Sequence, residues 1–135
     1  MNDKVGGLLL QMLVSHVVRE QRACINFGAA LQFLQPTFRP SWADDSDIGV
    51  LVHQIQEEAQ HYEKVRAVLM GLIGPDHTER SITMRWMRGV DKIIPRPESF
   101  LDHVVCVALN DRAGRIQLES VVSCAYEPYA AVARE

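Results

Sequence analysis

The chain has 135 residues, of which 47% are hydrophobic and 23% are charged, and its formal net charge is −3 at pH 7. This length allows one domain with its own core, and the composition is ordinary for a globular protein. The slightly acidic balance argues against nucleic acid as a partner. Cys24, Cys106 and Cys124 form no CxxC pair and are typical of a reducing compartment.

A first helix is predicted over residues 5–34, where apolar residues recur with helical period and Pro36 follows. The apolar run near its start is interrupted by Gln11, Ser15 and His16, so it does not span a bilayer. The run also lacks the cationic start and the small-residue cleavage pattern of a signal peptide. We therefore expect a cytoplasmic protein that has no membrane partner.

A second helix is predicted over residues 41–73, where Ser41 and Asp44 match the pattern of a capping box. A connector follows over residues 76–98, and its stretch SITMRWMRGV is a candidate short helix. A third helix is then predicted over residues 99–126.

Pro128 is well placed as a first-turn proline, so the last residues predict the start of a fourth helix. No stretch shows the alternation of a strand. The sequence therefore predicts an all-α fold with a single domain over residues 1–135. The simplest architecture is an up-down helical bundle of three long antiparallel helices plus the start of a fourth.

Each long helix carries a carboxylate near the middle of its predicted buried face. Alternating spacings of three and four place Glu20 on the first face, Glu58 on the second and Asp111 on the third. His61 lies one turn after Glu58, where side chains are neighbours on a helix surface. On the third helix the predicted buried positions are Leu101, Val104, Ala108, Asp111, Arg115, Leu118 and Val122.

Three carboxylates buried at one level of a bundle predict a metal site. Unpaired burial would be costly. Burial with mutual repulsion would raise the pKa values of Glu58 and Asp111 in a metal-free protein, unless Arg115 compensates. A shared cation removes the repulsion, because the carboxylates then become its ligands. A site rich in carboxylates with one imidazole per ion suits iron or manganese better than a closed zinc site.

A structural interpretation of the same residues stays open beside the metal site. Glu20 would then pair with Arg19 or Arg22, and Asp111 would neutralise Arg115 one turn away. Among the remaining histidines, His16 is expected to be a core residue or to lie behind Glu20. His103, next to Asp102, is expected on the surface.

Four stretches of the sequence carry a resemblance to a known family. They are SHVVRE around Glu20, EEAQH around Glu58 and His61, LND at Asp111, and AYEPYA before the last helix. With them the chain resembles the ferritin-like di-iron carboxylate proteins, which form helical bundles. More narrowly, it resembles the catalytic subunits of ring-1,2-phenylacetyl-CoA epoxidases, which act in phenylacetate catabolism.

The resemblance implies a di-iron cofactor, with manganese as the alternative metal. It implies that Glu20 and His61 bind iron, that Glu58 binds or bridges, and that Asp111 is the ligand from the third helix. The implied activity is that of a monooxygenase, which activates dioxygen to oxidise an aromatic ring held as a coenzyme A thioester. The implied partners are a helical structural subunit and a reductase.

One element of the family pattern is missing from this sequence. The ExxH motif of the fourth helix is expected a few residues beyond Glu135, so the ligand set is incomplete. Either the chain is a truncated or split product, or another chain supplies the missing helix, or the site no longer binds two metals. Two other functions remain open: a non-catalytic helical assembly subunit, and an iron- or manganese-binding storage or protective protein.

An incomplete fourth helix also predicts self-association. The apolar faces of the three long helices fit a bundle of four helices, so an incomplete fourth helix would leave an apolar trough between them. A homo-oligomer or a partner helical subunit would cover this trough. The residues expected to line this trough are Val17, Phe27, Tyr62, Val65 and Val122.

Overall fold

The computed structural model describes residues 3–74, 89 and 96–134. Within these residues the chain is helical and contains no strand, which confirms the predicted all-α bundle. The short helix expected in the connector lies outside the described residues, except for Gly89, which is helical. The elements are α1 (Asp3–Ala30), the 3-10 helix η1 (Leu31–Leu34), α2 (Asp45–Ile73), α4 (Phe100–Val121) and α5 (Glu127–Arg134).

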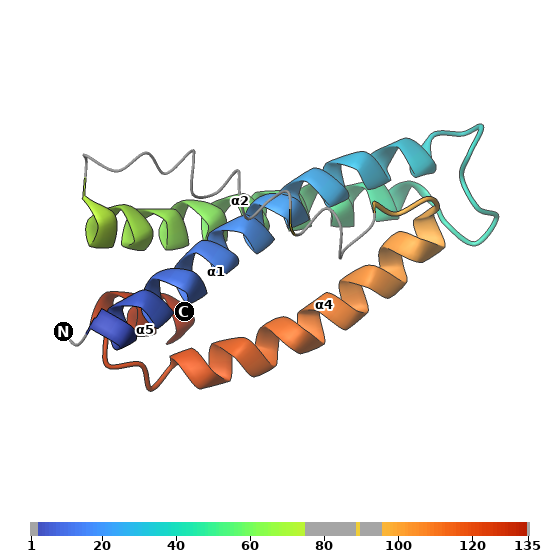
Figure 1. Cartoon of the computed structure of the whole chain (residues 1–135). Helices are drawn as coiled ribbons and strands as arrows, with labels where there is room; N and C mark the ends of the chain where they lie inside the picture. The colour runs from blue at the N-terminus through green and yellow to red at the C-terminus, as the bar shows by residue number, and fades with distance from the viewer. Residues whose placement is uncertain (1–2, 75–88, 90–95, 135) are drawn as a thin grey trace.

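Helices α1 and α2 form the main pair of the bundle and run antiparallel along most of their length (Figure 1). Helix α4 begins at the end of the bundle where α2 also begins, and it runs in the same direction as α2. The order is therefore not strictly up and down as predicted, because one pair of helices is parallel. Such a pair is expected where a long segment joins two helices, as in ferritin-like bundles.

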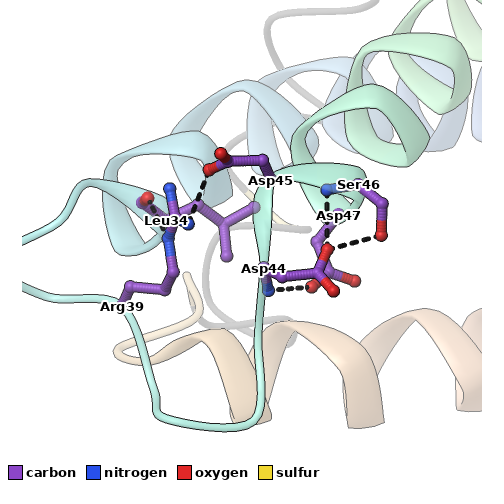
Figure 2. Close-up of polar contacts among 6 residues, drawn as sticks. All are labelled: Leu34, Arg39, Asp44, Asp45, Ser46 and Asp47. Carbon is purple, nitrogen blue, oxygen red and sulfur yellow. Dashed lines mark hydrogen bonds and ion pairs between the residues drawn. The ribbon is translucent and has the colours of Figure 1, made fainter.

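The N-cap of α2 is Asp44, whereas the predicted capping box began at Ser41. Asp44 accepts a hydrogen bond from the Ser46 amide at 2.7 Å, and its own amide donates to the Asp47 carboxylate at 2.8 Å (Figure 2). This reciprocal pattern is a capping box. Ser41 lies instead in a turn, where the Ala43 amide donates to the Pro40 carbonyl at 3.0 Å.

Arg39 ties the connection between α1 and α2 to both helices. Its Nε atom donates to the Leu34 carbonyl at 2.9 Å, and Nη1 contacts Oδ1 of Asp45 at 2.6 Å (Figure 2). The last turn of η1 and the first turn of α2 are thereby held at a fixed separation. At α4, Ser99 is the N-cap, since its side chain accepts from the Asp102 amide at 3.1 Å.

Two apolar clusters fill the core, one toward each end of the bundle. The first contains the N-terminal half of α1, the C-terminal half of α2, and the buried residues Val121 and Tyr129. The second contains the other ends of α1 and α2 with Phe100 of α4. The predicted buried faces of α1 and α2 are confirmed, because each of their positions is buried or half-buried. The polar residues of those faces lie between the two clusters.

The predicted buried face of α4 is wrong by one residue. The most buried positions of this helix are Phe100, His103 and Val121. The half-buried positions Val107, Gly114 and Gln117 continue the same line, which runs one residue before the predicted one. One residue corresponds to about 100° of rotation around a helix. Most of the predicted positions are accordingly exposed, and the exposed large apolar residues of α4 and its C-cap are Leu101, Val104, Val105, Leu109, Ile116 and Val122.

The predicted trough is also largely covered. Val17 and Val65 are buried in the cluster that contains Tyr129 of α5, and Tyr62 packs against the same cluster. Phe27 is buried in the second cluster. The short helix α5 therefore occupies part of the space that was expected to be open, while self-association stays a prediction.

We expect the α2 cap to contribute measurably to stability. Asp44→Ala removes the acceptor for the Ser46 amide and should lower the free energy of unfolding by about 1 kcal/mol, measured by urea denaturation. Asp44→Asn is the matched control, because asparagine caps helices about as well as aspartate. An equal loss in both variants would show that the charge of Asp44, and not its capping geometry, stabilises the helix.

Candidate metal centre

Glu20, Glu58 and His61 come together between the two apolar clusters. Glu20 lies on α1 and is 5% exposed, whereas Glu58 and His61 lie one turn apart on the facing side of α2. One carboxylate or imidazole atom from each residue lies within 4.8 Å of the others. This group can hold a metal ion, as predicted. Glu20 is buried, Glu58 is half-buried and His61 is exposed, so the group opens toward solvent on its α2 side.

A chain of hydrogen bonds from α5 reaches Glu20 through His16. The Nε2 atom of His16 lies 3.0 Å from Oε1 of Glu20, and its Nδ1 atom lies 2.9 Å from the Tyr129 hydroxyl. Nε2 donates to an ionised Glu20, and the Tyr129 hydroxyl accepts from Nδ1 of a charged ring or donates to Nδ1 of a neutral one. Burial raises the pKa of Tyr129 to about 12, so its hydroxyl stays protonated and can donate. His16 is therefore a core residue that orients Glu20.

Arg19 provides the second contact of Glu20. Its Nη2 atom lies 3.0 Å from Oε1 of Glu20, and Nη1 donates to Oε1 of Gln117 on α4 at 2.6 Å. The same guanidinium thus joins α1 to α4 and carries a positive charge next to the carboxylate. This is the ion pair between Glu20 and Arg19 that the structural interpretation predicted.

The two carboxyl groups share a single proton near neutral pH. Burial, followed by the hydrogen bond and negative charge of Glu20 and the charge of Asp111, raises the pKa of Glu58 to about 8. Burial also opposes ionisation of Glu20, but hydrogen bonds to His16 and Glu58 together with the charges of His16 and Arg19 outweigh it. The pKa of Glu20 is thereby lowered to about 2. The predicted rise for Glu58 is confirmed, and its cause is burial with repulsion between carboxylates.

These residues border a cavity of about 300 Å³ between α1, α2 and α4. Asp111 borders the same cavity from α4, and its charge contributes to the raised pKa of Glu58. Asp111 is exposed, however, and is not part of the group of close ligand atoms. The structure therefore brings together Glu20, Glu58 and His61, and places Asp111 at the rim of their cavity.

Several residues of the site were not identified from the sequence. His103 was expected on the surface, yet it is 2% exposed and borders the cavity with Asn26. The prediction failed because the rotation assigned to α4 was wrong by one position. Tyr129 could be recognised as apolar, but no local pattern reveals a hydrogen bond to a residue 113 positions earlier in the chain.

Comparisons with known proteins find no match for this chain. No family model matches the chain, and neither a curated protein nor a solved structure matches it. None of the described helices combines the length and the apolar character needed to cross a membrane.

The raised pKa of Glu58 predicts an unusual dependence of stability on pH. From pH 4.5, the ordinary value of this carboxyl, to about pH 8, the folded chain retains a proton that the unfolded chain releases. The free energy of unfolding of the metal-free protein should therefore fall as the pH rises through this window. Glu20 acts in the opposite sense, and its contribution is lost only as the pH falls from 4.5 toward about 2.

Urea denaturation at several pH values in the presence of a chelator measures this dependence. Glu58→Gln should flatten the decline, because glutamine is neutral in both the folded and the unfolded state. Glu57→Gln is the matched control, since Glu57 is an exposed neighbour on the same helix and its variant should keep the decline. A decline that persists in Glu58→Gln would show that Glu58 does not hold the shared proton.

Proposed function

We propose that this chain binds iron, or manganese in its place, at Glu20, Glu58 and His61. The observation that supports the proposal is the approach of two carboxylates and one imidazole to within 4.8 Å of one another, at a position that is buried at Glu20 and open to solvent at His61. Carboxylate oxygens with one imidazole nitrogen form a donor set suited to iron and manganese. The raised pKa of Glu58 supports it further, because a cation would replace the proton that now relieves the repulsion.

The side chains that contact Glu20 can hold it in a fixed orientation for binding a metal. Carboxylates that bind metals are held by hydrogen bonds from neighbouring side chains, and His16 with Tyr129 supplies such a link to Glu20. Glu58 must release its proton when a cation binds. Asp111 at the cavity rim is the additional carboxylate that we assign to this centre.

We further propose that the protein belongs to the oxygenase lineage of ferritin-like di-iron proteins. When bound, an iron pair of this kind activates dioxygen for the oxidation of an organic substrate, here an aromatic coenzyme A thioester. The parallel pair α2 and α4 supports this lineage, since ferritin-like bundles contain one long connection (Figure 1). The described ligands do not fill two metal positions, so another chain or segment would complete the site and a reductase would supply electrons.

A second function has its own supporting observation. Arg19 already lies 3.0 Å from Glu20, and a proton shared with Glu58 relieves the remaining repulsion. A helical assembly subunit without metal could keep these buried groups for structure alone. The two functions differ in a measurable way, because only the first predicts stabilisation by a metal ion.

Anaerobic titration of the metal-free protein with Fe(II), and separately with Mn(II), tests the proposal. We expect saturable binding by calorimetry and a rise in the melting temperature. Glu58→Gln should weaken binding by at least tenfold, which corresponds to about 1.4 kcal/mol. Asp111→Asn should weaken binding less, because Asp111 lies outside the close group.

Two exposed acidic residues provide matched controls for these variants. Glu57→Gln on α2 and Asp102→Asn on α4 remove the same charge from the same helices and should leave the affinity unchanged. The stoichiometry of the titration gives the number of irons per chain, and Mössbauer spectroscopy after oxidation distinguishes a coupled pair from a single ion. Absence of saturable binding in the unmodified chain would favour the structural subunit instead.

A further inference from the structure

His103 is a buried histidine whose ring nitrogens have no hydrogen-bond partner in the described part of the chain. The ring is 2% exposed and lies edge-on to Phe27, with 4.9 Å between the ring centroids. Phe100 stacks on it at 6.2 Å. These aromatic contacts fix the ring, so its nitrogens cannot turn freely toward solvent. Burial lowers the pKa of His103, which keeps the imidazole neutral with one donor and one acceptor nitrogen.

Asn26 presents a second unsatisfied polar atom to the same space. It is 9% exposed, and its Oδ1 atom has no hydrogen-bond partner among the described residues. Asn26 and His103 both border the cavity of about 300 Å³, together with the apolar side chains of Phe27, Val107 and Leu118. Buried polar atoms in native proteins nearly always have a partner. No described residue supplies one to these atoms, so a molecule that enters the cavity can satisfy them.

We propose that this part of the cavity is a binding site for a small organic molecule that carries a hydroxyl group. A hydroxyl group both donates and accepts, so it can satisfy the Asn26 oxygen or either nitrogen of His103. The apolar walls favour a hydrocarbon body, and the volume lies at the lower end of the range for ligand sites. This site is distinct from the proposed metal site, because its polar groups are those of Asn26 and His103 and not those of Glu20, Glu58 or His61.

Fluorine NMR with 4-fluorophenol and 4-fluorotoluene tests the site, because the two probes differ by a hydroxyl and a methyl group. The metal-free chain is titrated in the presence of a chelator. We expect 4-fluorophenol to bind at least tenfold more tightly than 4-fluorotoluene. Failure of 4-fluorophenol to bind at millimolar concentration, or equal affinity for both probes, would overturn the proposal. Because no metal is present, this result is independent of whether the chain binds iron.

Variants that remove the polar atoms but keep the shape locate the bound probe. Asn26→Leu and His103→Phe should each reduce the preference for 4-fluorophenol, and the double variant should abolish it while retaining binding of 4-fluorotoluene. Urea denaturation of each variant checks that it is folded. His53→Phe is the control, because His53 is an exposed histidine of α2 and its variant should keep the preference. A preference that survives in the double variant would place the probe elsewhere and contradict the proposal.

Discussion

The arrangement of this protein depends on accommodating one buried and one half-buried carboxyl group in the middle of a helical bundle. Glu20 and Glu58 face each other from α1 and α2, and both cannot ionise at low cost in the same place. A shared proton, His16 and Arg19 relieve the conflict in the metal-free chain. Two of these groups also contact a further helix: Arg19 contacts Gln117 of α4, and His16 contacts Tyr129 of α5.

The two apolar clusters keep this polar layer at a fixed height. Leu13 and Leu69 lie in the cluster on one side of it, and Phe27 and Leu51 lie in the cluster on the other. A shift of α1 along α2 would remove apolar contacts in both clusters at once, and buried apolar surface is worth about 25 cal/mol per Å². The register that buries the apolar residues is therefore the register that brings Glu20 to Glu58.

The sequence was sufficient to predict the buried faces of α1 and α2, because each helix has one apolar face and one polar face. Their periodicity identified the inward direction, and with it Glu20 and Glu58. The exposed His61 was identified by its spacing of one turn from Glu58. Helix α4 is different, since Leu101, Leu109 and Ile116 are exposed apolar residues on the side away from the core. Periodicity in one sequence cannot decide which of two apolar faces packs inward. Because of that ambiguity, Asp111 was predicted on the buried face although it is exposed, and His103 was predicted on the surface although it is buried.

The connection through α5 shows how a helix without a metal ligand can determine the geometry of the site. Tyr129 is fully buried, and its hydroxyl is the partner of His16 Nδ1. If α5 moved away, this nitrogen would lose its partner in a buried position, at a cost of about 1–3 kcal/mol. His16 would then be less restrained, and so would the carboxylate that it contacts at 3.0 Å. Docking of α5 and orientation of Glu20 are therefore energetically coupled, although α5 itself does not border the cavity.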